Sequence, residues 1–394
     1  MRKLKEPISI TGLSSVSALG SGMEVIAGAY EDQNHSLIHK DIGHQKVWVG
    51  ELPKKEREEI ARLRQSDSKY RGLDNTVVSA LYVSRKAVEQ AGWGEGENFG
   101  INVGSSRGAT QLFEDYHREF LEKGETSTLT SPTTTLGNIS SWVSHDLKSK
   151  GPTISHSVTC STAFHAILNG IAWIQSGLMD KFLVGGSEAA LTPFTISQMQ
   201  ALKIYSRGFA QTQTLDRGYP CRALDLKKKE NSMVVGEGAA MACLESGNPK
   251  NTLARILGVG YATEVLEHNV SISTEASCFQ DSMKMALGEL SPEKVDAIVL
   301  HAPGTIKGDF SEFRAIEKVF GPNPPFLTTN KWKIGHTFGA SGMLSLEMAI
   351  LMMKQQEPIP VPFVEYQALP KKIDYVLVNA VGFGGNAVSI LLSS

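Results

Sequence analysis

The sequence contains few cysteines, and none lies in a pattern that binds metal or builds a disulfide framework. Its 394 residues include four: Cys160, Cys221, Cys243 and Cys278. No two of them form a CxxC pair, and no histidine flanks them at the spacing of a zinc site, so neither a zinc knuckle nor a disulfide scaffold is predicted. We therefore expect no metal site and a reducing compartment.

The sequence also lacks a strong excess of charge and any long apolar run. Its formal net charge is -2 and its 39 basic residues are dispersed, which argues against a nucleic-acid or anionic-membrane surface. No apolar run reaches membrane-spanning length, and Pro7 interrupts any signal-peptide core at the basic N-terminus. With 41% hydrophobic and 20% charged residues, the chain has the composition of a soluble globular protein, and we expect it in the cytoplasm.

Strand-like and helix-like segments alternate along the chain, which predicts an α/β fold. Expected strands that run into small residues lie at 8–20, 99–110 and 181–190. A helical spacing runs from Leu73 to Ala91 and ends at Gly92. The order of small-residue turn, apolar helix and apolar strand recurs at 296–305, 335–353 and 374–386. Two similar halves are therefore expected, 1–250 and 251–394.

Residues 153 to 177 carry the first candidate for chemistry. The stretch TISHSVTCSTAFHAILNGIAWIQSG has strand-like content up to Val158 and helical spacing beyond Ser161, so Cys160 is predicted at a strand-to-helix junction. Free N–H groups and the helix dipole at such a junction would stabilise a thiolate and bring the pKa of the cysteine toward neutrality. Cys160 is therefore a candidate nucleophile, with an ordinary buried cysteine as the alternative.

Two histidines stand in matching positions of the second half. His301 ends an expected strand at HAPGT, and His336 heads the apolar helix at GHTFGASG. Either one alone could be a hydrogen-bonded structural residue. Because both lie beside Gly-rich turns, after the same kinds of element as Cys160, a shared site is favoured. Neutral imidazoles side by side can donate hydrogen bonds to a carbonyl oxygen and stabilise an enolate formed there.

Five stretches together carry a resemblance to a known family. They are GPTISHSVTCSTAFHA around Cys160, GYPCRALD and VVGEGAA within 218–240, HAPGTIKGDFSEFRAI at 301–316, NKWKIGHTFGASG at 330–342 and NAVGFGGNAVSILL at 379–392. With them the chain resembles, nearly end to end, the β-ketoacyl-acyl-carrier-protein synthases of the type I/II branch, which are condensing enzymes of the thiolase superfamily. The resemblance implies a thiolase-like five-layered αβαβα fold and a dimer in which residues 124–142 help line the neighbouring pocket.

The resemblance implies an acyltransferase that performs a decarboxylative Claisen condensation. Cys160 matches the family's acyl-accepting cysteine, and His301 and His336 match its two active-site histidines. An acyl primer would pass onto Cys160, and a malonyl extender on an acyl carrier protein would lose carbon dioxide to give the attacking enolate. Fatty-acid, polyketide or polyene biosynthesis would use this step. The phosphopantetheine arm of the carrier would be the only prosthetic group, with no metal and no other cofactor.

Three further residues match the family's active site. Lys331 matches its lysine, and Glu312 matches the acidic residue that pairs with that lysine. Phe383 in GFGG matches the gating phenylalanine, whose N–H joins that of Cys160 in the oxyanion hole. Without the resemblance, Lys331 and Glu312 would be interpreted as solvated charges and Phe383 as a turn aromatic in the core.

Two other functions were weighed against the condensing enzyme. One is a non-catalytic partner subunit that sets chain length in a heterodimeric ketosynthase, but such subunits characteristically lack the cysteine that this chain keeps at Cys160. The other is a thiolase or a synthase acting on coenzyme A thioesters. Thiolases use a second cysteine near the C-terminus, where GFGG stands here.

The residues that match the acyl pocket are unusual. Arg107 in GSSRG stands where apolar residues are usual, Thr130 stands where a bulky aromatic can stand, and Met199 replaces an aromatic. An arginine buried beside an alkyl tail is costly unless it is paired. Arg107 therefore hints at a conjugated, aromatic or polar acyl chain, as in pigment or polyene pathways, with a solvent-facing arginine as the alternative. Thr305 keeps the last position of the family's HGTGT, but Pro303 replaces a threonine expected to touch the pantetheine.

The entrance is expected to be basic, because the carrier protein is acidic. Lys69, Arg71 and Lys203 match the family's carrier-binding surface, where a few charges affect the encounter rate more than the affinity; plain solvated charges are the alternative. One departure has no functional explanation in the sequence. Between Asp225 and Gly236 the chain has two residues more than the family pattern, and KKKENSMVV replaces the usual Asp-Gly-Phe.

Overall fold

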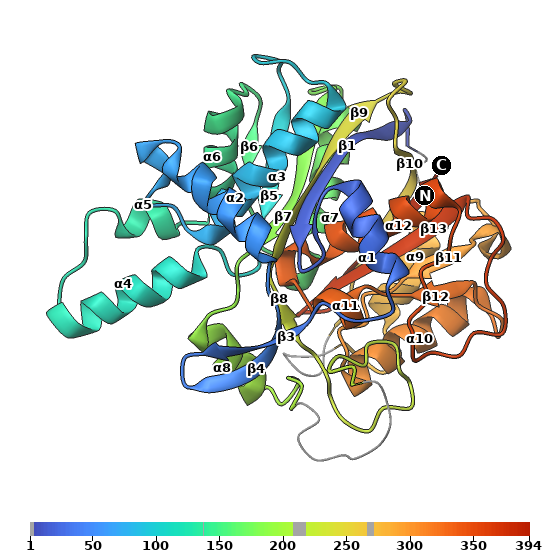
Figure 1. Cartoon of the computed structure of the whole chain (residues 1–394). Coiled ribbons are helices and arrows are strands. Elements are labelled where there is room, and N and C mark those ends of the chain that lie inside the picture. The colour runs from blue at the N-terminus through green and yellow to red at the C-terminus, as the bar shows by residue number, and fades with distance from the viewer. Residues whose placement is uncertain (1–3, 137, 208–217, 266–271) are drawn as a thin grey trace.

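The computed structural model describes residues 4–136, 138–207, 218–265 and 272–394. Within these residues, eleven strands form one mixed sheet and three form a small second sheet (Figure 1). The large sheet contains β1 (Ile8–Ser17), β2 (Gly20–Ser21), β5 (Gly100–Gly104), β6 (Thr153–Ile154), β7 (Lys181–Glu188), β9 (Gly238–Ser246), β10 (Ala254–Thr263), β11 (Ala297–Val299), β12 (Phe326–Thr328), β13 (Tyr375–Gly382) and β14 (Asn386–Ser393). The small sheet contains β3 (Ile38–Ile42), β4 (Gln45–Gly50) and β8 (Val235–Gly236).

Helices cover the large sheet on its outer faces and fill the space between its two halves. They are α1 (Met23–Glu31), α2 (Lys54–Gln65), α3 (Asn75–Ala91), α4 (Thr110–Lys123), α5 (Thr130–Thr134), α6 (Asn138–Leu147), α7 (Thr162–Gln175), α8 (Pro193–Ala201), α9 (Ser277–Leu287), α10 (Ile306–Phe320), α11 (Lys331–Ile334) and α12 (Ser341–Gln355). Short 3-10 turns are η1 (Ser68–Tyr70), η2 (Thr159–Ser161), η3 (Pro292–Lys294) and η4 (Phe338–Ala340). The expected helix that ends at Gly92 is α3, capped at its start by the side chain of Asp74.

The two halves of the large sheet have the same topology. The strand orders are β1-β9-β7-β5-β6 in one half and β10-β14-β13-β11-β12 in the other. In each half the first two pairings are antiparallel and the last two are parallel. The halves meet where β1 pairs with β10, with Ile8 opposite Ile256. This confirms two similar halves; the division of the chain at residue 250 stays a prediction.

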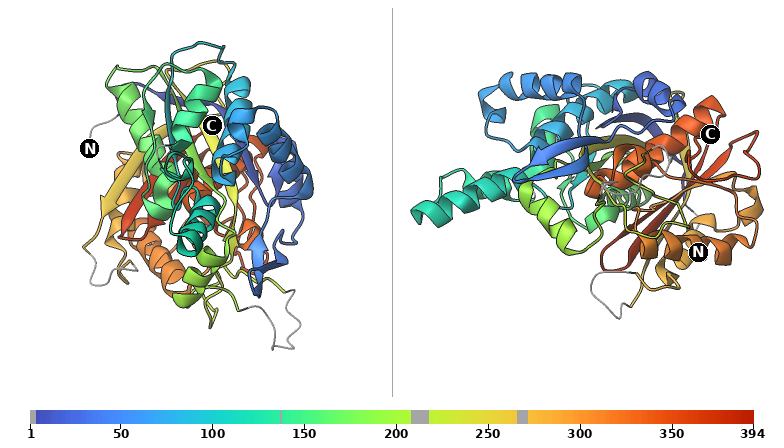
Figure 2. Two further views of the ribbon diagram at one scale, coloured as in Figure 1. Left: turned by 90° about the vertical axis from the view of Figure 1, so that its left-hand side faces the viewer. Right: turned by 60° about the horizontal axis from the view of Figure 1, so that its bottom comes forward.

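Five layers follow from the alternation of apolar side chains along the strands. On β7, Phe182 and Val184 face the core that contains α7 and α12, whereas Leu183 faces the core under α3. The helices α7 and α12 touch each other between the two halves, α3 and α6 cover one outer face, and α9 and α10 cover the other (Figures 1 and 2). Because sheets lie on both of its sides, α12 is buried along almost its whole length.

One expected boundary differs from the structure. The strand predicted to reach Val158 ends at Ile154, because β6 pairs over only two residues with β5 at the edge of the sheet. The segment 124–142, which the resemblance places at a neighbouring pocket, contains α5 and the start of α6, while Gly137 lies outside the described residues. In the described ranges no helix is long and apolar enough to cross a membrane.

Candidate active site

Cys160 lies on a strained turn at the start of the central helix α7. In η2, Thr159 has a φ of 47°, a left-handed conformation that is rare for a β-branched residue. Thr162 stabilises the turn, since its hydroxyl donates to Thr159 O at 2.6 Å and accepts from Val158 N at 2.9 Å. The turn ends the irregular segment after β6 and places Cys160 directly before the N-terminus of α7.

A matching turn precedes α12 in the second half. Phe338, which corresponds to Thr159, has a φ of 41°, and Gly339 stands in the place of Cys160. The two turns pack against each other. A Cβ on Gly339 would lie 2.6 Å from Ser106 N and 2.8 Å from Glu188 Oε2, so a glycine is required there. One turn therefore carries Cys160, and the other packs closely against Ser106 and Glu188.

Cys160 is shared by two hollows, which also have Phe338 and Phe383 in common. The first is a cavity of about 250 Å³, and the second has a volume of about 320 Å³. The lining of the first includes His301, His336, Met199, Met233, Pro303 and Thr305. The lining of the second includes Ser106, Arg107, Thr110, Phe113, Phe194 and Gln198. A thioester on Cys160 would thus have space on two sides.

The two histidines lie together in the first cavity. The ring centroids of His301 and His336 are 5.2 Å apart, with the ring planes at 90°. Burial lowers the pKa of His336 to about 3 and that of His301 well below its ordinary value, and the charge of Lys331 acts in the same direction on both. Both imidazoles are therefore neutral at physiological pH. Since unfolded histidines take up protons near pH 6.5, their burial costs stability as the pH falls below that value.

His336 has an unused polar atom. Its Nδ1 is buried and has no hydrogen-bond partner in the part of the chain that the structure describes, and its ring lies 5.3 Å from that of Phe338, measured between centroids. A buried polar atom without a partner is costly. The arrangement fits a site that a bound molecule completes.

The thiol of Cys160 differs from the sequence-based expectation. Burial raises its pKa to about 12, and the charge of Glu188 adds to the rise, while Arg107 and Lys331 oppose it. The expectation of a pKa near neutrality was wrong for the free protein, because it weighed the helix N-terminus but not the loss of solvent around the sulfur. Cys160 rests as a neutral thiol and must lose its proton as it reacts.

Lys331 is buried beside neutral partners. Its Nζ donates to Asn330 Oδ1 at 2.9 Å and to Ser345 Oγ at 3.2 Å. The pairing with Glu312 expected from the sequence is not a contact ion pair among the described residues. The two charges interact at longer range, where Glu312 opposes the burial that lowers the pKa of Lys331 to about 8.

Glu312 holds the backbone around His301. Its carboxylate accepts hydrogen bonds from His301 N at 3.0 Å and Ala302 N at 2.8 Å, and from Asn379 Nδ2 at 3.2 Å. Burial raises the pKa of Glu312 to about 7, against these hydrogen bonds. Asn379 was not expected as part of the site, although a polar residue within the apolar strand at DYVLVNAV was a usable signal.

Glu188, at the end of β7, was also missed. Its buried carboxylate accepts from Ser105 Oγ at 2.9 Å, Ser106 N at 2.8 Å, Arg107 N at 3.0 Å and Gly339 N at 2.9 Å. It therefore ties the GSSRG turn of the first half to η4 of the second. The acid in the otherwise apolar stretch KFLVGGSE was the available signal, but its partners are remote in sequence.

Arg107 faces the second hollow and does not point away into solvent. Its Nη1 donates to Gln198 Oε1 at 2.5 Å, and its Cζ lies 4.9 Å from the centroid of the Phe338 ring. Its Nε is buried and has no hydrogen-bond partner among the described residues. Burial lowers the pKa of the guanidinium, and Glu188 opposes that shift.

Three of the four other predicted site residues line a hollow together with Cys160. Met199 is buried in the first cavity, and Thr305 lines the same cavity while its hydroxyl accepts from Gly308 N at 3.1 Å. Phe383 is 39% exposed and borders both hollows. Thr130, the first residue of α5, is not among the residues that line either hollow in the described chain.

The three predicted entrance residues are not brought together. Lys203 is exposed just after α8, and its carbonyl accepts from Asn231, a residue of the cavity lining. Lys69, in η1, pairs with Asp67 at 3.4 Å and borders a separate surface depression beside α6. Arg71 is exposed next to it.

The site offers a nucleophile and hydrogen-bond donors. Within the described residues no group of three or more His, Cys, Asp or Glu side chains could hold a metal ion, and the buried carboxylates of Glu188 and Glu312 are occupied by N–H and hydroxyl donors. A thiol and two neutral imidazoles around one cavity suit acyl transfer and stabilisation of an enolate oxygen.

Proteins of similar sequence and fold are known, and their names agree with acyl-transfer chemistry. Residues 21–249 match the family model described as beta-ketoacyl synthase, N-terminal domain, and residues 253–365 match that of the C-terminal domain. The 3-oxoacyl-[acyl-carrier-protein] synthase 2 of Coxiella burnetii is 28% identical, and the match covers 99% of each protein.

Two solved structures have the same fold and cover 99% of both chains. They are the ishigamide ketosynthase/chain length factor, with a TM-score of 0.83 and 20% identity, and a type II PKS acyl-carrier protein in complex with its ketosynthase bound to the hexaketide, with a TM-score of 0.83 and 18% identity. The five-layered arrangement of two similar halves is thus the thiolase-like αβαβα fold.

Proposed function

Because the chain belongs to the β-ketoacyl synthase family, we propose that it extends an acyl group held on Cys160 by decarboxylative condensation with a malonyl unit on an acyl carrier protein. The observation that carries the proposal is the meeting of Cys160, His301 and His336 in one cavity. A thiol accepts the acyl group there, and two neutral imidazoles face the place where an enolate would form. Fatty-acid, polyketide or polyene biosynthesis would use the product.

Acyl transfer forms a thioester on Cys160. The sulfur attacks the carbonyl carbon of the carrier thioester, the carbon–sulfur bond to the phosphopantetheine breaks, and the thiol proton goes to the leaving sulfur. The N–H groups of Cys160 and Phe383 are the proposed donors to the oxyanion, and the N-terminus of α7 adds partial positive charge. Since burial favours the neutral thiol, proton loss accompanies the attack.

Condensation then takes place on the histidine side. The malonyl carboxylate leaves as carbon dioxide, and its electron pair moves to an enolate whose oxygen accepts hydrogen bonds from His301 and His336. The enolate carbon attacks the acyl carbonyl, and the Cys160 sulfur leaves as a thiolate that takes up one proton. Lys331 helps to keep both imidazoles neutral, so they donate without giving up a proton.

The proposal includes a carrier protein and a second subunit. The Coxiella relative is named for an acyl carrier protein, one structural neighbour is a complex with its acyl-carrier protein, and another is a ketosynthase/chain length factor pair. In this chain Lys203 lies near the cavity mouth, whereas Lys69 and Arg71 lie elsewhere. A carrier would contact all three only if a second subunit, identical or related, brought them to one surface. We place the reaction in the cytoplasm, with no cofactor beyond the carrier's arm.

The intact mass of the protein after incubation with a panel of acyl carriers tests this function. We expect the mass to rise by one acyl group, and Cys160→Ala to show no adduct and no elongation, because no other group in the cavity is a comparable nucleophile. Because the thiol is small, its removal in Cys160→Ala should leave the circular dichroism spectrum unchanged. Elongation of a primer by the folded Cys160→Ala protein would overturn the assignment.

A further inference from the structure

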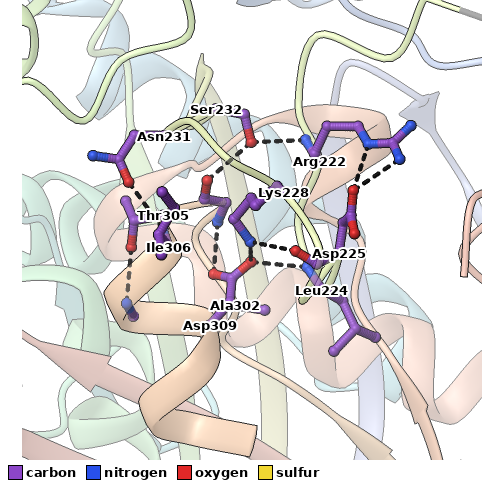
Figure 3. Close-up of polar contacts among 12 residues, drawn as sticks. Arg222, Leu224, Asp225, Lys228, Asn231, Ser232, Ala302, Thr305, Ile306 and Asp309 are labelled. Carbon is purple, nitrogen blue, oxygen red and sulfur yellow. Dashed lines mark hydrogen bonds and ion pairs between the residues drawn. The ribbon is translucent and has the colours of Figure 1, made fainter. Parts of the chain in front are cut away.

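The segment 222–232, which contains the unexplained lysines, packs against the turn that carries His301. We call residues 301–305 the His301 turn. Figure 3 shows side chains of the segment reaching the start of α10 and this turn. Lys227 and Lys229 are exposed, but Lys228 points inward to Asp309. The departure from the family pattern therefore lies beside the proposed site.

Two carboxylates of α10 hold the backbone of the His301 turn. Glu312 accepts from His301 N and Ala302 N, and Asp309 accepts from Gly304 N at 3.0 Å. The two acids are three residues apart, so they share one face of the helix, and both are completely buried. Their hydrogen bonds fix the turn relative to α10.

Only one of these two acids has a contact ion pair among the described residues. Lys228 Nζ lies 2.5 Å from Asp309 Oδ2, and the side chains are 5% and 0% exposed. The same oxygen accepts from Leu224 N at 2.9 Å. Removing one partner of a buried pair leaves an uncompensated charge, which is strongly destabilising unless the group becomes neutral. The charge of Asp309, and with it the strength of its bond to Gly304, depends on Lys228.

The rest of the segment holds the other side of the turn. Ser232 donates to Gly304 O from both its N–H and its hydroxyl, each at 2.9 Å. Asn231 accepts from Ile306 N and donates to Lys203 O, each at 2.9 Å, and it lines the first cavity. Gly304, with a φ of 91°, is therefore held at its N–H by Asp309 and at its carbonyl by Ser232.

We propose that Lys228 is a positioning residue of the condensation: through Asp309 it fixes the His301 turn, and with it the imidazole that meets the extender. The inference rests on the proposed function. Lys228 is not among the residues that line the first cavity and its side chain is almost fully buried, so we do not expect it to touch the carrier or the substrate. Its removal should therefore lower the rate of the step that uses His301 without weakening the binding of the carrier.

The test compares Lys228→Met with Lys227→Met, which removes an exposed neighbouring charge. The measurements are carbon dioxide release from a malonyl carrier and alkylation of Cys160 by iodoacetamide. A misplacement of about 1 Å can cost about 100-fold in rate, so we expect kcat for Lys228→Met to fall about 10- to 100-fold. KM and the alkylation rate should stay within about 2-fold of the parent. Lys228→Arg, which keeps the charge, should restore most of kcat, and Lys227→Met should match the parent.

Each outcome separates this inference from the proposed function. A parent protein that releases no carbon dioxide from any malonyl carrier contradicts the proposed function. If the parent protein is active and Lys228→Met is equally active, the inference alone is contradicted. It is also contradicted if Lys228→Met loses decarboxylation and alkylation of Cys160 to the same extent, because the substitution would then have disturbed the structure as a whole. If Lys228→Met does not fold, the double variant Lys228→Met/Asp309→Asn, which leaves no unpaired charge from this buried pair, is measured in its place. The same selective loss of kcat supports the inference, and parent-like kcat overturns it.

Discussion

Arg107 lines the second hollow beside Cys160, and we expect it to limit which acyl groups the proposed active site accepts. Its guanidinium keeps its charge at any relevant pH and lies half-buried over the Phe338 ring, with Nε unpaired in the described chain. The charge of Glu188 opposes the burial that lowers the pKa of this guanidinium. A saturated alkyl chain in this hollow would remove water from the guanidinium without forming a favourable interaction with its charge. An acyl group with π-electrons would interact favourably with the cation.

We therefore expect polyunsaturated or aryl-bearing acyl carriers to be extended faster than saturated ones of equal length. A cation–π contact would account for a preference of about 2- to 10-fold in the specificity constant. Arg107→Ile should narrow this preference by improving the saturated substrate. Gln198→Leu, which removes the hydrogen bond to Nη1 but keeps the charge, serves as the control and should retain it. Equal rates for a matched pair of primers in the parent protein would contradict the idea.

Some residues of the site could be predicted from the sequence and others could not, for a physical reason. Cys160, His301 and His336 each lie at a turn beside an apolar strand or helix, so the local pattern was enough to select them as candidates. Lys331 and Glu312 look like surface charges in isolation, and only the family resemblance selected them. Glu188 was missed because its donors come from two segments that are distant from it in the sequence, 105–107 and Gly339, and a local sequence pattern cannot reveal such contacts.

At the scale of elements, two matching turns meet in the middle of the molecule. The turn η2 leads into α7 and η4 leads into α12, and the end of β13 packs against η2. Helical spacing and apolar runs were enough to predict α3, α12, β7 and β13. The length of β6 was wrong, because an edge strand ends where its neighbour stops pairing, and that depends on tertiary contacts.

Gly382, at the end of β13, is expected to be essential for the turn that carries Cys160. A Cβ at this position would lie 2.1 Å from Thr159 Oγ1 and 2.6 Å from Val158 O, so Gly382→Ala must push η2 away. We expect a loss of about 1 to 3 kcal/mol in stability from overpacking and a fall of about 10-fold or more in the acylation rate of Cys160. Thermal unfolding and mass-detected acylation measure the two effects.

Gly28 provides the matched control for this substitution. It lies within α1, and a Cβ at this position would have no heavy atom within 4 Å. Alanine in a helix interior is more stable than glycine by about 0.5 to 1 kcal/mol, so Gly28→Ala should be at least as stable as the parent and acylate normally. A Gly382→Ala protein that behaves like Gly28→Ala would show that η2 tolerates the displacement.

At the scale of the whole molecule, α4 stands apart from the five layers. Figures 1 and 2 show it projecting from the body next to α5. It carries large apolar side chains into solvent, with Phe113 57%, Phe120 47% and Leu121 70% exposed. Several exposed apolar residues on one element mark an interaction surface. The segment after α4 is the one for which the resemblance implies contact with a neighbouring pocket.

We expect a second subunit to cover α4, and Leu121→Asp to weaken the dimer. A charge placed in an apolar interface loses its hydration without gaining a partner, so the mass in solution should shift from that of a dimer toward that of one chain.

Light scattering after size-exclusion chromatography measures this mass in solution. Leu178→Asp serves as the control, because Leu178 is 67% exposed and belongs to the connection between α7 and β7 and not to α4. A parent protein that is monomeric at micromolar concentration, or a Leu121→Asp protein that stays dimeric, would contradict the assignment of α4 to the interface. Loss of condensation together with the dimer would show that the neighbouring chain completes the second hollow, whose rim residue Phe113 lies on the same helix.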